Sequence, residues 1–150
     1  MGNTYANLLY HAVFSTKDRE PLIDEKWQDD LYGYMGGIVR GSRGALLKSG
    51  GVANHVHLLL KLPASVAIAD MLRLVKANSS NWVRDSNLVI GKFAWQSGYG
   101  AFTVSQSQVP DVEQYIQNQA AHHRGRSFQE EFLSLLERHG IEYDPKYLWD

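Results

Sequence analysis

The sequence predicts an α+β fold, in which an antiparallel sheet packs against two helices and further helices follow at the C-terminus. Two observations predict it. Segments with alternating apolar and polar residues, which indicate strands, are interleaved with segments whose apolar residues recur every three or four positions, which indicate helices. Their order is strand, helix, strand, strand, helix, strand, and two more helices follow. No repeat or linker interrupts residues 1–150, so we expect a single domain.

The first half of the chain supplies three of the strands and one helix. We expect strands over residues 5–14, 45–48 and 52–62, and a helix over residues 24–39. The helix is indicated by four residues at helical spacing, Trp27, Leu31, Tyr34 and Ile38. Gly50-Gly51 is a frequent hairpin sequence and predicts the turn between the second and third strands.

The second half supplies the other helices and the last strand. We expect a helix that Ser65 caps and that runs to about residue 84, a strand over residues 101–104, and a helix from Pro110 to about residue 123. Ser127 and Glu130 fit a capping box for a last helix, which Gly140 closes. The apolar tail, residues 147–149, is expected to dock on the body of the protein.

The order βαββαβ is that of the split βαβ, or ferredoxin-like, pattern. In that topology the first and third strands lie in the middle of the sheet. The third strand contains the stretch "ANHVHLLL", with His55 and His57 two residues apart. Because alternate residues of a strand point to the same face, the two imidazoles should lie side by side. Val56, Leu58 and Leu60 should then point to the opposite face.

The overall composition is that of an ordinary soluble globular protein. It is 44% hydrophobic and 21% charged, and the formal net charge is −1. The sequence contains no run of about 20 apolar residues, which a membrane span would need. The N-terminus lacks the features of a signal peptide. We therefore expect a cytoplasmic protein. Cysteine is absent, which excludes disulfides and thiolate metal sites. Any metal ion must therefore be held by nitrogen and oxygen ligands.

Adjacent imidazoles can share a metal ion, and they can equally be polar residues on a solvated face. A metal site would need at least one more ligand. The side chains considered as further ligands are Asp24, Glu25, Asp70, His122 and His123. His11, on the first strand, could neighbour the pair, although a core or surface position is the more ordinary interpretation.

The predicted third helix offers a second pair of polar side chains. Tyr115 and Gln119 are four residues apart, so they lie on one face of a helix, one turn from each other. If that face packs towards the sheet, a phenol and an amide oxygen would approach the histidines. A carboxamide oxygen suits Mg²⁺ or Mn²⁺, and a tyrosine oxygen beside such an ion can attack a phosphate. The alternative to these functional roles is that Tyr115 is a packing residue and Gln119 an exposed residue on the helix surface.

Taken together, several segments resemble the single-tyrosine HUH transposases, which the smallest bacterial insertion sequences encode. The resemblance covers nearly the whole chain and is carried by "YHAVFSTKDREPLI", "GGVANHVHLLLKLP", "KFAWQSGYGAFTVS" and "VEQYIQNQAAHHRGRSFQEEFLSLLERHGIEYDPKYLWD". In the HUH motif two histidines flank a bulky hydrophobe, here His55, Val56 and His57. The catalytic tyrosine of the family matches Tyr115, and its third metal ligand matches Gln119.

What the resemblance implies is a transposase that cleaves and rejoins single-stranded DNA. A divalent metal ion, Mg²⁺ or Mn²⁺, would be held by His55, His57 and Gln119. Tyr115 would attack a phosphate, release a 3′-hydroxyl and keep the 5′-phosphate as a phosphotyrosine, and another 3′-hydroxyl would reverse the step. No ATP is implied, in agreement with the absence of a phosphate-binding G-x-x-x-x-G-K-[ST] loop.

The resemblance also implies partners. Members of the family act as homodimers, recognise imperfect DNA hairpins near the ends of the element, and include chromosomal relatives that process repeated palindromes. Between residues 61 and 92 this chain has five basic and two acidic side chains, a local charge of +3. The basic residues considered for phosphate contacts are Lys61, Arg73, Lys76 and Arg84. On charge alone, a solvated helix face explains them equally well.

Two other functions stay open. A metal-dependent phosphoesterase or nuclease would use the same histidines with an activated water molecule and no covalent step. A non-catalytic module would bind single-stranded nucleic acid through aromatic residues exposed on a ferredoxin-like sheet. For this second function the first strand offers Tyr10 and Phe14, whereas the third strand offers histidines and no aromatic pair.

Overall fold

The structure, a computed structural model, describes residues 2–150. Four strands form one antiparallel sheet in the order β2-β3-β1-β4. Their bounds are Leu8–Ser15 for β1, Ala45–Val52 for β2, His55–Leu62 for β3 and Gly100–Val104 for β4. β1 pairs with both β3 and β4, so the first and third strands are central and the predicted α+β, ferredoxin-like topology is confirmed.

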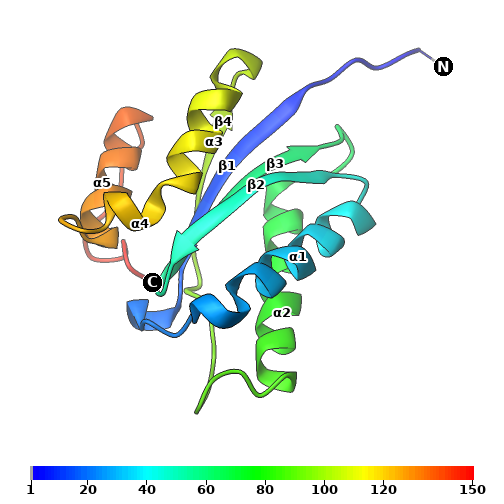
Figure 1. The fold of residues 1–150 in the computed structure, drawn as a ribbon. Coiled ribbons are helices and arrows are strands. Elements are labelled where there is room, and N and C mark those ends of the chain that lie inside the picture. The colour runs from blue at the N-terminus through cyan, green and yellow to red at the C-terminus, as the bar shows by residue number, and fades with distance from the viewer. Residues whose placement is uncertain (1) are drawn as a thin grey trace.

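Helices cover both faces of this sheet (Figure 1). The bounds are Glu25–Gly41 for α1, Ile68–Asp85 for α2, Val109–Gln117 for α3, Gln119–His122 for α4 and Phe128–Arg138 for α5, with short 3-10 turns at Lys17–Arg19 and Gln106–Gln108. α1 and α2 lie on one face, and α3, α4 and α5 lie on the other. None of the helices within residues 2–150 combines the length and the apolar character that a membrane span needs.

The two faces of β3 differ in chemistry as its alternating pattern predicts. Val56, Leu58 and Leu60 are fully buried in the large core beneath α1 and α2. His55 and His57 point to the other face, and both side chains are also fully buried. The α1–α2 face therefore contains most of the apolar core, whereas the second face buries polar groups under the C-terminal helices.

The turn between β2 and β3 is not at Gly50-Gly51, as the sequence suggested, but at Ala53-Asn54. Both glycines lie within β2. Neighbouring backbone comes so close to these two positions that a side chain would not fit there. A Cβ atom on Gly50 would lie 2.3 Å from the carbonyl oxygen of Ile116 in α3. Glycine at position 50 thus lets the helix that carries Tyr115 pack directly on the sheet.

The predicted helices exist, but some of their details were wrong. α2 begins at Ile68 after Ala67, without a side-chain cap, because a Pro63–Val66 backbone turn places Ser65 before the helix. α1 is rotated slightly from the expected face and buries Met35 and Val39 in place of Tyr34 and Ile38.

Tyr34 is 39% exposed, and its ring stacks on Trp82 of α2 at the edge of the core. The third predicted helix is divided at Asn118 into α3 and α4.

The C-terminal segment holds α5 against the second face of the sheet. Ser127 and Glu130 form the expected capping box at the start of α5. Leu148 and Trp149 of the tail pack against the cluster that contains Phe128 and Phe132, while Tyr147 stays 58% exposed. The backbone N–H of Gly98 also donates to the carbonyl of Asp150. α5 is thus fixed from both of its ends.

We expect Gly50→Ala to lower the free energy of unfolding by about 1–3 kcal/mol, because the new methyl group would collide with the α3 backbone. Gly33→Ala is the matched control. Gly33 lies on the exposed side of α1 with open space around it, so there alanine should stabilise the helix by about 0.5–1 kcal/mol. Urea unfolding measures both. Equal effects of the two substitutions would contradict the close packing of α3 on β2.

Candidate active site

The two histidines of β3 are held so that their Nε2 atoms face one small volume. His55 Nδ1 lies 2.7 Å from the side-chain oxygen of Asn54. His57 Nδ1 lies 2.8 Å from Nε2 of His11, a buried residue of β1. Partners on the Nδ1 atoms fix the ring orientation and the tautomer of histidines that bind metal ions through Nε2. His11 is therefore a supporting neighbour of the site.

The C-terminal helices bring Tyr115 and Gln119 to the same place. Gln119 is 1% exposed, and its Oε1 lies 3.0 Å from His55 Nε2. The Tyr115 ring lies 5.7 Å from the His57 ring, centroid to centroid. The helix break at Asn118 does not separate the pair, since the Gln119 amide still donates to the Tyr115 carbonyl oxygen at 3.4 Å. The face that carries these two side chains thus packs towards the sheet.

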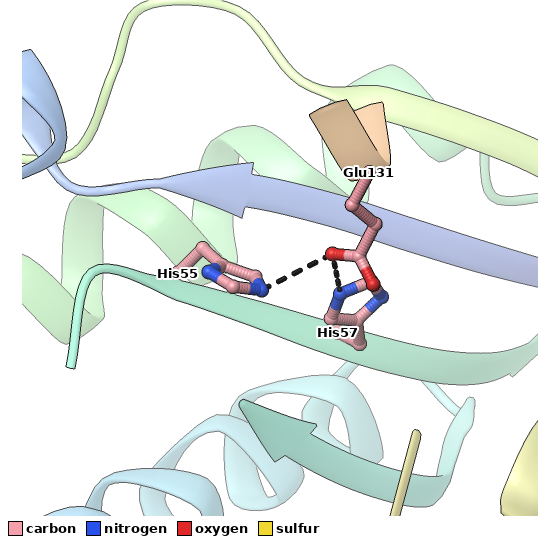
Figure 2. A group of neighbouring side chains, drawn as sticks. All are labelled: His55, His57 and Glu131. Carbon is pink, nitrogen blue, oxygen red and sulfur yellow. Dashed lines mark hydrogen bonds and ion pairs between the residues drawn. The ribbon is translucent and has the colours of Figure 1, made fainter. Parts of the chain in front are cut away.

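Glu131 of α5 is at the centre of the site, and our reading of the sequence missed it. Figure 2 shows its carboxylate above His55 and His57, with both ring Nε2 atoms directed at the same oxygen. That oxygen, Oε1, lies 2.9 Å from His57 Nε2 and 3.2 Å from His55 Nε2. The other oxygen, Oε2, accepts hydrogen bonds from the Tyr115 hydroxyl and, at 3.1 Å, from the Gln119 amide.

A signal for Glu131 was present in the sequence. α5 has an apolar stripe made of Phe128, Phe132 and Leu135, and Glu131 falls on this stripe, three residues after Phe128. A carboxylate on the apolar face of a helix is almost never buried without partners. The histidines on the facing strand are those partners, but only the packing of α5 on the sheet brings them together.

The donor and acceptor pattern around His55 fits a bound cation. A neutral histidine ring whose Nδ1 donates to Asn54 leaves its Nε2 lone pair available to a cation. That lone pair faces two oxygens, Gln119 Oε1 at 3.0 Å and Glu131 Oε1 at 3.2 Å. A positive ion between these three atoms would be held by all of them. One ligand atom each from His55, His57 and Glu131 lie within 4.8 Å of one another.

Nitrogen and carboxylate or amide oxygens form the ligand set that suits Mn²⁺ and other divalent cations, and Mg²⁺ when oxygens dominate. The protonation states favour the same use. Burial lowers the pKa of His57 to about 4, although the Glu131 carboxylate opposes the shift, and burial lowers the pKa of His11 to about 3. Burial alone would raise the pKa of Glu131, but hydrogen bonds from His55, His57 and Tyr115 outweigh it and lower the pKa. At neutral pH His57 and His11 are therefore neutral, and Glu131 is ionised.

Tyr115 is protonated in this arrangement. Burial, followed by its hydrogen bond to Glu131, raises the pKa of the phenol above its usual range. The hydroxyl is thus a neutral donor to the carboxylate. A nucleophilic role would require its proton to leave while the phosphate is attacked.

The other ligand candidates lie in different surroundings. Asp24, Glu25 and Asp70 are exposed on the α1–α2 face, away from the histidines. His123 belongs to the cluster, with Nε2 at 3.1 Å from Glu131 Oε1, and the His122 ring lies against the Tyr115 ring.

The four basic residues considered for DNA contacts do not share one surface. Arg73, Lys76 and Arg84 lie on α2, whereas Lys61 is exposed on the opposite face of the sheet. Lys76 donates to the carbonyl oxygens of Ser97 and Gly98, and burial lowers its pKa to about 8. Arg84 donates to the Phe93 carbonyl oxygen. Two of these side chains therefore also support the loop that leads into β4.

A family model and solved structures relate this chain to known transposases. A family model described as "Transposase IS200 like" matches residues 4–119. No curated protein gives a significant match. A crystal structure of a candidate transposase from Deinococcus radiodurans R1 is similar over 79% of this chain and 96% of that chain, with a TM-score of 0.62 and 25% sequence identity.

A second similar structure is that of a REP-associated tyrosine transposase bound to a REP hairpin. It aligns with 83% of this chain and 73% of that chain, with a TM-score of 0.61 and 12% identity. At 12% identity, the similarity between the two proteins shows a shared fold and nothing more.

We expect Mn²⁺ to stabilise the wild-type protein, by about 2.7 kcal/mol when the free ion is at 100 times its dissociation constant. His55→Asn and His57→Asn should abolish this stabilisation, and Glu131→Gln should weaken it because the negative ligand is lost. His122→Asn is the control, because His122 is not among the clustered ligand atoms. Thermal unfolding with and without Mn²⁺ measures the effect. Equal stabilisation of all four variants would place the metal elsewhere.

We expect the metal-free protein to lose stability as the pH falls from 7 to 5. The unfolded chain takes up protons on His11 and His57 near pH 6.5, whereas the folded protein takes them up only near pH 3 and 4. Stability then falls with decreasing pH, by about 1.4 kcal/mol per unit for each histidine that is charged only in the unfolded chain, and so by about 2–3 kcal/mol per unit once both are charged. Below pH 4.5, Glu131 adds a loss of the same sign, because its pKa is lowered on folding.

Urea unfolding in EDTA at several pH values measures this dependence. His11→Gln should flatten the curve between pH 7 and 5, because one of the two titrating groups is removed. A wild-type stability that stays constant over this range would contradict the neutral state of the buried histidines.

Proposed function

Because the chain belongs to the IS200-like transposase family, we propose that it cleaves and rejoins single-stranded DNA through a covalent bond to Tyr115. The observation that carries this proposal is the contact of the Tyr115 hydroxyl with the buried carboxylate that also meets His55 and His57. A nucleophile, a proton acceptor and a set of metal ligands thus occupy one site. Neither of the other two functions accounts for a tyrosine hydroxyl at this position.

In this proposal, His55, His57 and Gln119 hold a divalent metal ion, Mg²⁺ or Mn²⁺, and Glu131 adds a carboxylate to the set. The ion would polarise the phosphate and offset the charge that develops on its oxygens. His11 and Asn54 act through the histidines, whose Nδ1 atoms they contact. Their role is to keep both Nε2 atoms directed at the ion.

The cleavage step starts with Tyr115 as a neutral phenol. Its oxygen forms a bond to phosphorus while the bond from phosphorus to the 3′ oxygen breaks, and the phenolic proton passes to Glu131, which already accepts its hydrogen bond. The departing 3′ oxygen takes a proton from solvent water and becomes a hydroxyl. The 5′-phosphate remains on Tyr115. Attack by a second 3′-hydroxyl reverses each of these changes and forms the new DNA junction.

We propose DNA that carries a hairpin as the substrate, and a homodimer as the acting form. The similar REP-associated transposase was solved with a REP hairpin, which supports a hairpin partner here. We keep Lys61, Arg73, Lys76 and Arg84 as proposed phosphate contacts. Because they lie on two surfaces, the contacts by α2 would hold a part of the DNA distant from the cleaved strand.

The competing enzymatic function is a phosphoesterase that uses water in place of Tyr115. Tyr115→Phe separates the two, because it removes only the hydroxyl oxygen. We expect wild-type protein with Mn²⁺ and single-stranded DNA from the flanks of its own gene to form an adduct that survives denaturation. Tyr115→Phe should form none, a loss of at least about 100-fold in trapped product.

Tyr5→Phe is the matched control, since Tyr5 is 89% exposed and distant from the site. Gel electrophoresis of labelled DNA after denaturation gives the readout. Free cleaved product, formed equally by wild type and Tyr115→Phe without an adduct, would overturn the covalent mechanism and favour the phosphoesterase. Binding without cleavage across a panel of flanking sequences would favour the non-catalytic module.

A further inference from the structure

We propose that the groove between α3 and α5 binds a nucleotide of single-stranded DNA next to the phosphate that Tyr115 attacks, with its base stacked on His139. This inference rests on the proposed function and names the part of the substrate that the site grips. The groove is a cavity of about 540 Å³ that lies over β4, a volume typical of sites for small organic ligands. Tyr115 and His11 line it, so the groove opens onto the metal-ligand cluster.

His139 provides a flat surface in this groove. Its ring stacks on Phe102, with centroids 4.3 Å apart and an angle of 21° between the planes. Its Nδ1 donates to the carbonyl oxygen of Leu135 at 2.8 Å, which fixes the rotation of the ring. The residue is nevertheless exposed, whereas Phe102 beneath it is buried. An aromatic ring that is held rigidly and still exposed is the kind of platform on which proteins stack unpaired bases.

The walls of the groove differ in charge. Arg138 on α5 carries a positive charge, and within residues 2–150 it has no ion-pair partner. Asp111 and Gln108, at the start of α3, form the opposite wall with acceptor and amide groups. A carboxylate repels phosphate and accepts hydrogen bonds from the N–H groups of a base edge, which are amino groups in adenine and cytosine and the ring N3–H in thymine. The sugar-phosphate chain should therefore follow Arg138, with the base edge turned to α3.

This groove fits single-stranded DNA better than a duplex. A base reaches His139 only if it is not stacked on its neighbours. Paired bases in a duplex remain stacked on one another and so cannot reach the ring. The same groove leads to Tyr115, so a strand lying in it would bring the adjoining phosphate to the phenol. Gripping the neighbouring nucleotide would fix the scissile phosphate in line, which is the main contribution that binding makes to a phosphoryl transfer.

The test measures binding in EDTA, where no cleavage competes. The probes are fluorescein-labelled dT12, an abasic 12-mer with the same phosphates, and a 12-base-pair duplex. We expect His139→Ala to weaken dT12 binding about 5- to 50-fold and to leave the abasic 12-mer unchanged. His139→Phe should retain the affinity, because stacking persists, whereas His139→Leu should lose it although it can still cover Phe102.

Arg138→Gln should weaken dT12 and the abasic 12-mer alike, by about 3- to 10-fold, and reduce the salt dependence of binding. Arg40→Gln, on the exposed side of α1, is the matched control and should change neither. Fluorescence anisotropy gives the affinities, and circular dichroism checks that each variant is folded. Equal affinities of wild type, His139→Ala and His139→Leu for dT12, or equal losses for dT12 and the duplex, would overturn the groove assignment.

The adduct assay separates this proposal from the proposed function. If the groove variants lose dT12 affinity but the wild-type protein forms no adduct, the groove proposal is supported and the transposase chemistry is refuted. An adduct that forms in wild type, and forms equally fast at low DNA concentration in His139→Ala, would support the chemistry and refute the groove.

Discussion

The second face of the sheet is organised around one buried anion, the carboxylate of Glu131. The side chain is 1% exposed, and an ionised carboxylate at that depth costs several kcal/mol, on the order of 5, unless it is paired. The partners come from separate parts of the chain: His57 from β3, Tyr115 from α3, Gln119 from α4 and His123 beyond it. Satisfying this one group therefore fixes how three helices dock on the strand.

That arrangement depends on a division between the two faces of the sheet. The face beneath α1 and α2 contains the large apolar cluster, which supplies the hydrophobic driving force for folding. The other face is divided between two smaller clusters, and the polar site lies between them. The close approach of α3 to Gly50 is what lets Tyr115 reach the histidines. Polar chemistry can be buried here because stability is provided elsewhere.

The features that the sequence predicted are those set by local geometry. Alternation along a strand placed His55 and His57 together on one face of that strand. Helical spacing placed Tyr115 and Gln119 together on one face of a helix. The capping box of Ser127 and Glu130 located the start of α5 for the same reason. Each of these patterns involves residues within a few positions of one another, so their relative placement depends little on the rest of the fold.

The features that were missed depend on tertiary contacts. Glu131 is 74 positions from His57, and only the docking of α5 brings them together. Gly50-Gly51 was taken for a turn because nothing local distinguishes a flexible glycine from one that makes room for a neighbouring helix. His11 and His57 lie in different strands, and their contact follows from strand register, in which His57 is paired with Val13. Register is not visible in a single strand.

The extent of the family match divides the site into two parts. The matched segment, residues 4–119, contains His55, His57 and Tyr115 and ends at Gln119. Glu131 and Arg138 come from α5, and His139 directly follows it, all beyond that segment. The proposed nucleophile, Tyr115, and three of the proposed metal ligands therefore belong to the part shared with the family model, whereas Glu131 does not. The segment beyond Gln119 would thus add the proposed proton acceptor and the proposed nucleotide platform to a site whose histidines and tyrosine lie within the shared part.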